Sequence, residues 1–271
     1  MPELPEAETI VRQIRGTLRG ATLGRVRHLR DEIVRAGGAR TIRKLLPGRT
    51  VRAVFRRGKR IVLDLDNERR LVFGLGMTGH LAVVPAEWEV AKHTHLRVAL
   101  NGGDAELRFR DARRFGGIWL LDGADAGAGF DRLGVEPLET DLRTFRRILA
   151  RSRRIKALLM DQAAIAGLGN IYCDEALYRA GIHPLARAAD LVPEQVKRLH
   201  RAIRRVLGEA IAAEGTTIKD YLTAWGESGS FQKRLRVYGR EGEKCLKCGT
   251  LVERVRAAGR STYFCPACQA P

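Results

Sequence analysis

Four cysteines near the end of the chain constrain its folding more than any other sequence feature. Cys245 and Cys248 form one pair, Cys265 and Cys268 form another, and sixteen residues separate the pairs. This spacing is typical of a zinc ribbon, in which two tight turns direct four thiolates at one Zn²⁺ ion. Because protein ligands fill all four positions, we expect one structural zinc ion and no zinc-based catalysis. Two disulfides are the alternative, and they require an oxidising compartment.

The net charge of the chain points to a polyanionic partner. Lysine and arginine total 49 against 31 aspartates and glutamates, which gives a net charge of +18 over 271 residues. Hydrophobic residues make up 45% of the sequence, enough for a core, so the charge does not indicate disorder. No apolar stretch reaches the roughly 20 residues of a membrane span, and the N-terminus lacks the basic start of a signal peptide. We therefore expect a cytoplasmic protein that does not bind membranes.

The spacing of apolar residues predicts an α+β protein. Helical spacing over residues 5–18 is followed by alternating runs that indicate an antiparallel β-sandwich or barrel, and later by helices. The predicted strands are 26–29, 51–55, 61–65, 71–75, 81–84, 96–100, 106–109 and 118–121, and the predicted later helices are 142–150, 155–160, 171–180, 193–213 and 218–225. We expect four segments, namely a sandwich domain at 1–122, a linker at 123–130, a helical domain at 131–236 and the cysteine-bearing unit at 237–271.

One face of the predicted helix 193–213 is strongly basic, while the opposite face is apolar, as expected for a helix that packs on a core. The charges are typical of a solvated face, and a contact with nucleic acid is the alternative. The basic residues are Lys197, Arg198, Arg201, Arg204 and Arg205.

The first residues of the chain can supply a nucleophile. Removal of the initiator methionine, which a small second residue permits, would leave Pro2 as a secondary amine. An α-amino group titrates near about 8 against about 10.4 for lysine, and the positive end of a helix favours its neutral form further. Such an amine can attack a sugar carbon and form a Schiff base, with Glu3 and Glu6 placed to move protons. The alternative is that these residues simply begin a helix.

Two glycine-containing turns carry side chains that can enter a DNA duplex. Met77 lies in the turn 74–79, and Arg113 precedes Phe115 in a second turn. An exposed Met or Phe beside cations can unstack a duplex and fill the space that an extruded base leaves. Burial in the core is the alternative for both side chains.

Three further polar residues lie on predicted turns. Lys59 occupies a basic turn between two strands, and Asn170 is expected to cap the helix that follows it, with nearby amides able to hold a phosphate. Arg260 follows a predicted hairpin turn at 257–259, from which a metal-stiffened strand could present it to a nucleic-acid backbone. The alternatives are that Lys59 merely belongs to a basic turn and that Asn170 only caps its helix.

Five motifs follow one another along the chain. They are Met-Pro-Glu-Leu-Pro-Glu at 1–6, Gly-Met-Thr-Gly at 76–79, Arg-Arg-Phe-Gly at 113–116, Gly-Leu-Gly-Asn-Ile-Tyr at 167–172 and the four-cysteine segment. Together they closely resemble the bacterial formamidopyrimidine-DNA glycosylases, also called 8-oxoguanine DNA glycosylases. The resemblance implies a base-excision-repair enzyme that flips out and removes oxidised purines and then nicks the strand by β,δ-elimination as an AP lyase. It also implies a two-layered β-sandwich, a helix-two-turn-helix domain and a zinc finger.

The resemblance assigns chemical roles to four residues of this chain. Pro2 would be the Schiff-base nucleophile and Glu3 the proton donor at the sugar. Lys59 would donate a proton in β-elimination and Arg260 in δ-elimination.

The resemblance also implies a site for the flipped nucleotide. Glu6 would lie close to the flipped base, and Met77, Arg113 and Phe115 would fill the void, with Arg113 facing the orphaned cytosine. The residues that would contact DNA are Lys59, His93, Arg113, Arg151, Asn170 and Arg260.

The chain departs from the family pattern at two positions, and a third position bears on which branch of the family it resembles. Gly74 stands where a histidine is frequent, and Ala112 replaces a frequent proline, which could loosen the turn that follows it. Leu4, where the endonuclease VIII-like enzymes for oxidised pyrimidines commonly have glycine, favours the purine branch. A pyrimidine-specific glycosylase and, in another class, a non-catalytic zinc-ribbon DNA-binding protein remain the alternatives. We expect damaged double-stranded DNA as the partner, no organic cofactor, a monomer, and a place at the bacterial nucleoid.

Overall fold

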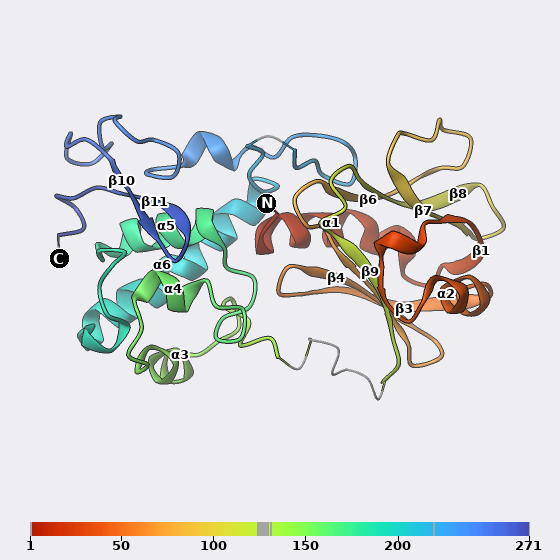
Figure 1. The fold of residues 1–271 in the computed structure, drawn as a ribbon, viewed down its shortest axis with the longest axis horizontal. Coiled ribbons are helices and arrows are strands. Elements are labelled where there is room, and N and C mark those ends of the chain that lie inside the picture. The colour runs from red at the N-terminus through yellow and green to blue at the C-terminus, as the bar shows by residue number, and fades with distance from the viewer. Residues whose placement is uncertain (1, 124–129, 131, 219, 271) are drawn as a thin grey trace. The chain divides into compact units, whose positions relative to one another are not determined.

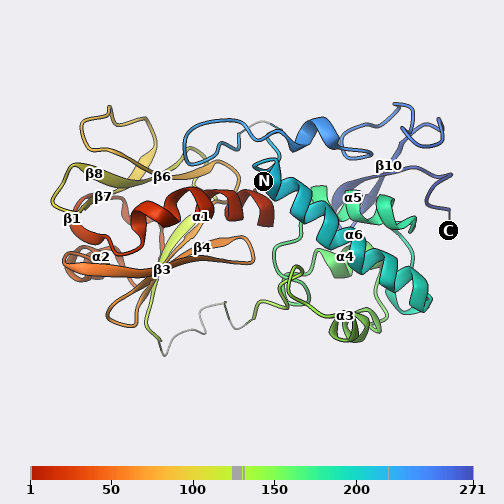
Figure 2. The same cartoon turned by 180° about the vertical axis from the view of Figure 1, so that it is seen from behind.

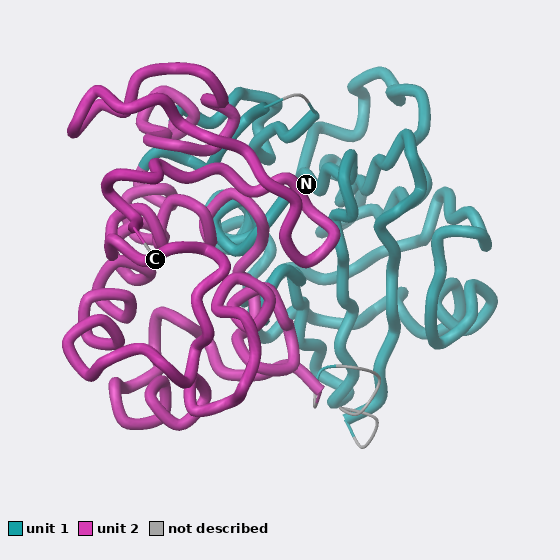
Figure 3. The backbone as a smooth tube through the Cα atoms, turned by 60° about the vertical axis from the view of Figure 1, so that its left-hand side comes forward, with its two compact units in different colours: residues 1–131, 213–230 teal, residues 132–212, 231–271 magenta. Residues whose placement is uncertain are grey.

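The computed structural model describes residues 2–123, 130, 132–218 and 220–270. The chain forms two compact units, one of residues 1–131 with 213–230 and one of residues 132–212 with 231–271 (Figures 1 and 3). The division into four segments stays a prediction, and residues 124–129 of its linker lie outside the described residues. No helix formed by the described residues combines the length and apolar character that a membrane span requires.

The first helix, α1 (Leu4–Leu18), lies across the strands of the first unit (Figure 2), against β3, β4 and β6. Its buried face includes Ile10, Ile14 and Leu18, which recur at helical spacing. Pro5 occupies the first turn, where its missing N–H costs no hydrogen bond. The predicted helix is confirmed and begins one residue earlier than expected.

The strands of the first unit form a β-sandwich, which confirms the predicted α+β class. One layer has the order β2-β9-β5-β4-β3 and the other β1-β7-β8-β6, with a short β1–β3 pairing between them. The rings of Phe73 and Phe109 meet across the core at 5.6 Å. The elements are β1 (Thr22–Leu29), β2 (Val34–Ala36), α2 (Ala39–Leu45), β3 (Arg49–Arg57), β4 (Arg60–Leu65), β5 (Arg70–Gly74), β6 (Gly79–Pro85), β7 (Thr94–Leu100), β8 (Ala105–Asp111) and β9 (Gly117–Leu121).

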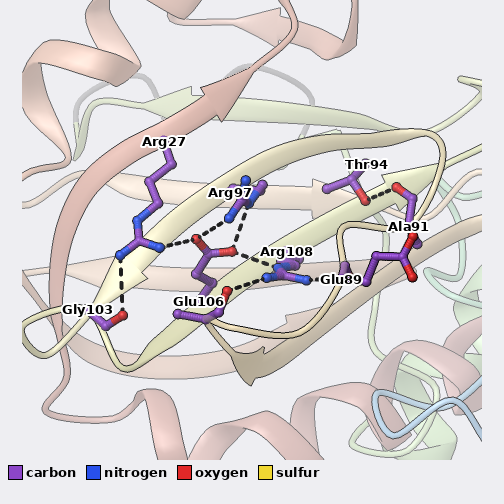
Figure 4. Close-up of polar contacts among 9 residues, drawn as sticks. Arg27, Glu89, Ala91, Thr94, Arg97, Gly103, Glu106 and Arg108 are labelled. Carbon is purple, nitrogen blue, oxygen red and sulfur yellow. Dashed lines mark hydrogen bonds and ion pairs between the residues drawn. The ribbon is translucent and has the colours of Figure 1, made fainter.

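A buried carboxylate pairs with three arginines of the sandwich (Figure 4). Glu106 is fully buried and accepts hydrogen bonds from Arg27 at 2.9 Å and from Arg108 at 2.7 Å. Arg97 adds two more, at 2.8 and 2.9 Å. Burial raises the pKa of Glu106, but the hydrogen bonds from Arg97 and Arg108 outweigh it and leave that pKa below its usual value. Three of the chain's arginines therefore join β1, β7 and β8 through one carboxylate.

The described residues of the second unit form four α-helices, a hairpin and two short 3-10 helices, Ala188–Asp190 and Phe231–Arg234. α5 contacts α4, α6 and β11, so it occupies the centre of this unit. The helices match four predicted ones within one residue at either end, and the predicted turn at 257–259 joins the hairpin strands. The elements are α3 (Leu142–Leu149), α4 (Ile155–Leu159), α5 (Asn170–Ala180), α6 (Pro193–Ala212), β10 (Glu253–Ala257) and β11 (Arg260–Phe264).

Two predictions about helices are wrong. Residues 218 and 220–225 form no helix, because this segment is held to α1 by side chains: Glu6 accepts the Thr216 N–H and Gln13 accepts the Ala224 N–H, both at 2.8 Å. Asn170 does not cap α5; Gly169 is the N-cap, and Asn170 is the first helical residue. The short elements α2 and β2 were not predicted.

Candidate functional site

The N-terminal end of α1 holds two buried carboxylates. Glu3 is 2% exposed and Glu6 is 1% exposed. They form a reciprocal capping box, in which Glu6 accepts the Glu3 N–H at 2.7 Å and the Glu3 side chain accepts the Glu6 N–H. The other Glu6 oxygen accepts the Thr216 N–H at 2.8 Å. Glu6 thus fixes the backbone that carries Pro2 and Glu3, and Pro2 itself is buried.

A tight turn at the start of the segment 213–230, which belongs to the first unit, packs on the Glu6 carboxylate. Gly215 has a φ of +86°, and a Cβ there would lie 2.9 Å from a Glu6 oxygen. The Tyr221 hydroxyl donates to the carbonyls of Glu6 and Glu214, at 3.4 and 3.2 Å. Burial, together with the nearby Glu6, raises the pKa of Tyr221. Sequence reasoning missed these residues because some 210 positions separate Glu6 from Thr216.

Lys59 lies on the turn between β3 and β4. Gly58 precedes it with a φ of +58°, a left-handed conformation that favours glycine. Arg56 donates to the Gly58 carbonyl at 3.0 Å and to Glu8 on α1 at 3.2 Å, which ties the hairpin to the helix. The turn and the start of α1 lie at the same end of the first unit (Figures 1 and 2).

One buried carboxylate joins the two wedge turns, which we define as residues 75–79 and 112–116. Asp111 is fully buried at the end of β8. It accepts a short hydrogen bond from the Thr78 hydroxyl and a second, at 2.7 Å, from the Gly116 N–H. A carboxylate that accepts from both turns holds them in register. The only sequence signal for this role was its place two residues before the Arg-Arg-Phe motif.

The wedge turns bring Met77, Arg113 and Phe115 together. The Arg113 N–H donates to the Thr78 hydroxyl at 3.0 Å, next to Met77, and the Arg113 guanidinium lies 4.6 Å from the centre of the Phe115 ring. Phe115 is 61% exposed, as expected for a wedge, whereas Met77 is half-buried. A Cβ at Gly76 would lie 2.3 Å from the Gly116 nitrogen, so only glycine allows this close approach.

His93 lies beside the second wedge turn. Its carbonyl accepts the Asp111 N–H at 3.1 Å, and its side chain is exposed. With Ala112 and Arg114 it lines a cavity of about 260 Å³. The structure therefore places His93 next to the second wedge turn.

In the second unit, Asn170 and Arg260 are neighbours. The Asn170 amide donates to the carbonyl of Ser261, the residue after Arg260, at 2.9 Å. The oxygen of the same amide, Oδ1, is buried and has no hydrogen-bond partner among the described residues. Arg260 is exposed at the start of β11. Arg151 is exposed between α3 and α4, and the contacts of the described residues do not join it to this pair.

The four cysteine sulfurs converge on one point. All four lie within 4.8 Å of one another, and none forms a disulfide. Cys248 Sγ lies 3.5 Å from the sulfurs of both Cys265 and Cys268. A tetrahedral zinc site with Zn–S bonds of about 2.3 Å requires sulfur separations of about 3.8 Å. Donor set and spacing therefore fit a closed four-thiolate metal site.

Two adjacent carboxylates on α5 hold the cysteine finger, residues 237–271. Glu175 is fully buried and accepts the N–H groups of Arg236, Val237 and Tyr238, at 2.9 to 3.0 Å. Asp174 accepts the Tyr263 N–H at 3.0 Å and pairs with the buried Lys156 at 2.7 Å.

Burial raises the pKa of Asp174 to about 7, although Lys156 opposes the shift. Burial also raises the pKa of Glu175, against the effect of its three backbone donors. Sequence reasoning missed both acids, since an acidic pair inside a helix is usually solvated.

Three family models match the chain in succession. The Formamidopyrimidine-DNA glycosylase N-terminal domain matches residues 1–118, the Formamidopyrimidine-DNA glycosylase H2TH domain matches 133–221, and the zinc finger found in FPG and IleRS matches 242–271. Together they cover most of the sequence.

Known proteins are similar to the chain over its whole length. The formamidopyrimidine-DNA glycosylase of Pelotomaculum thermopropionicum is 41% identical over 99% of both chains. A variant of the Lactococcus lactis enzyme, solved with DNA that contains Fapy-dG, is 34% identical and superimposes with a TM-score of 0.91 over both full chains. The wild-type Lactococcus lactis enzyme, solved with DNA that contains an oxidised pyrimidine, gives a TM-score of 0.90 at the same identity and coverage. Sequence, fold and site together place the chain in the formamidopyrimidine-DNA glycosylase family.

Proposed function

We propose that Pro2 is the nucleophile with which this base-excision-repair glycosylase removes oxidised purines from DNA. The observation that carries the proposal is the capping box. One Glu6 oxygen accepts the Glu3 N–H and the other accepts the Thr216 N–H, so the backbone next to Pro2 is fixed. A secondary amine held at a helix N-terminus is preorganised for attack. Its nitrogen would bond to C1′ of the damaged nucleotide while the bond from C1′ to the base breaks, and the base would leave with the N–H proton of Pro2. The bond from C1′ to O4′ would then break as O4′ takes a proton, which leaves the opened sugar bound to Pro2 as an iminium.

The other residues would divide the proton transfers between them. Glu3, buried beside Pro2, would supply a proton at the sugar. Lys59 would donate in β-elimination, which releases the 3′ phosphate, and Arg260 in δ-elimination, which releases the 5′ phosphate. Glu6 would lie close to the flipped base.

The wedge turns would fill the space left by the flipped nucleotide. Phe115 is exposed and Arg113 stacks on it, which supports a rigid wedge facing the opposite strand. His93, beside the turns, would contact the DNA backbone, as would Arg151 and Asn170. Asp111 would act as a positioning residue, because it holds both turns without reaching the DNA itself.

One zinc ion bound by the four cysteines would stiffen the finger. The sulfur spacing supports zinc, and the protein fills every ligand position. Zinc would supply folding energy rather than catalysis. We further propose that the enzyme works as a monomer without an organic cofactor, at the nucleoid in the bacterial cytoplasm.

Lesion preference tests the purine assignment. Excision should be faster on duplexes with 8-oxoguanine opposite cytosine than on duplexes with thymine glycol. The reverse order would favour the endonuclease VIII-like alternative, which deserves this test because a Lactococcus lactis relative has been solved with an oxidised pyrimidine in its DNA.

Lys59→Ala tests the role of the β3–β4 turn. We expect strand nicking at an abasic site to slow by about 100-fold, since general acid–base groups contribute roughly that much. Lys44→Ala is the matched control, because Lys44 is an exposed lysine on α2. A Lys59→Ala enzyme that nicks the strand at the wild-type rate would contradict the role of Lys59 in β-elimination.

A further inference from the structure

A cavity of about 730 Å³ in the second unit collects an excess of positive charge. The end of α5, one side of α6, the segment before the finger and the first cysteine turn all contribute to its wall. Its volume lies within the range of ordinary ligand sites. The cationic side chains in its wall are Arg179, Arg198, Arg201, Arg205, Arg236 and Lys247.

The cavity is separate from the residues that would serve the lesion. Asn170 begins α5, whereas Arg179 lies in its last turn, and nine residues of helix span about 13 Å. Neither Asn170 nor Arg151 nor Arg260 lines the cavity. The function proposed above therefore leaves this site unused.

The charges in the cavity are mostly uncompensated. Glu209 is the single carboxylate in its wall, and it pairs with Arg179 at 2.7 Å and with Arg205 at 2.8 Å. Within the described residues, no carboxylate pairs with Arg201 or Lys247. A hollow lined by one sign of charge concentrates the field of that charge and attracts an anionic ligand.

The wall also offers apolar surface that an anion alone would not use. Leu246, on the first cysteine turn, is 60% exposed, and Tyr178 is half-buried nearby. A DNA duplex is convex and would meet the rim through its phosphates, leaving Leu246 in water. A peptide can instead place carboxylates against the arginines and an apolar side chain against Leu246.

We infer that this cavity is a docking site for an acidic peptide segment of a partner protein. The segment would carry several Asp or Glu residues around one large apolar side chain. The basic face of α6 is then neither merely solvated nor a DNA contact, because Arg198, Arg201 and Arg205 line the cavity while Lys197 and Arg204 do not. This inference does not depend on the chemistry proposed for Pro2.

The test uses a fluorescein-labelled peptide with five aspartates around one phenylalanine, titrated with the full-length protein and followed by anisotropy. Arg201→Glu with Arg205→Glu should weaken its binding by at least about tenfold, since like charges now face each other. Lys197→Glu with Arg204→Glu changes the net charge equally on the same helix, outside the cavity, and should weaken binding less than about twofold. Leu246→Ser should weaken binding of the peptide by about fivefold and leave the affinity for undamaged duplex DNA unchanged.

Three results would overturn the inference. Equal losses from the two charge-reversal pairs would mean that net charge alone attracts the peptide. A larger loss of duplex affinity from the cavity pair than from the control pair would assign the cavity to DNA. Peptide binding unaffected by Leu246→Ser would show that the peptide does not contact Leu246. Excision of 8-oxoguanine by the cavity pair should stay within about twofold of wild type, which separates this site from catalysis.

Discussion

The sandwich and the cysteine finger support exposed residues that we propose act on DNA, and they do so by different means. In the sandwich, a large apolar core supports the wedge turns, and Asp111 only sets their register. The buried cluster of the finger consists of Val237, Val252 and two of the cysteines. A metal site and the buried carboxylates of α5 therefore do in the finger what apolar packing does in the sandwich. The comparison teaches that Phe115 and Arg260 can both be rigid although their surroundings differ.

Cys248→Ser should give the largest difference between the two regions, because it should unfold the finger and leave the sandwich folded. Structural zinc contributes on the order of 10 kcal/mol to the folding of a zinc finger, so losing one ligand should release the metal and unfold residues 237–271. The sandwich should keep its fold. Metal content and proteolysis of the finger measure both effects.

Cys173→Ala is the control for this variant, because Cys173 is fully buried in α5 and is not one of the four converging cysteines. It should retain the metal. Unchanged metal content in Cys248→Ser would refute the four-thiolate site.

Glu106→Gln and Glu175→Gln compare the two buried carboxylates directly. Glu106→Gln leaves three arginines around a neutral group and should cost about 3–5 kcal/mol, confined to the sandwich. Glu175→Gln weakens acceptance from three backbone N–H groups and should cost about 2–3 kcal/mol, confined to the finger and α5. Hydrogen exchange resolved by segment distinguishes them. Loss of protection in both units from either variant would show that the units are not supported independently.

Much of this architecture could be predicted from the sequence, because its signals are local. The spacing of apolar residues located eight strands and α1, and the spacing of Cys245, Cys248, Cys265 and Cys268 located the metal site. The long-range polar contacts could not be predicted. The helix predicted at 218–225 does not form, since Glu6 and Gln13 of α1 bind the backbone of this part of the chain instead.

The missed residues of the site share one physical property. Asp111, Asp174 and Glu175 are carboxylates that each accept at least one backbone N–H, and such a partner has no sequence signature. Asn170 was placed at the right helix end but given the wrong role, because its amide binds the Ser261 carbonyl rather than capping α5.

Glu209→Gln should give the smallest loss of stability of these variants, and the size of that loss should depend on pH. Hydrogen bonds from Arg179 and Arg205 lower the pKa of Glu209 to about 2. A carboxyl with a lowered folded-state pKa stabilises the fold above its unfolded pKa of about 4.5 and loses that contribution as the pH falls through about 2. The variant should therefore be less stable than wild type at pH 7, by no more than about 1 kcal/mol for this partly exposed group. Denaturation curves at pH 7 and pH 2.5 should show the difference shrinking, and a constant difference would contradict the ion-pair origin.

Borohydride trapping on a duplex with 8-oxoguanine opposite cytosine tests the central claim most directly. Reduction of the iminium would leave the wild-type enzyme covalently bound to DNA. Pro2→Gly removes the ring that fixes the amine, and a nucleophile displaced by about 1 Å loses roughly 100-fold in rate, so the adduct should nearly disappear. A wild-type enzyme that gives no adduct, or a Pro2→Gly enzyme that gives an undiminished one, would contradict the assignment of Pro2 as the nucleophile.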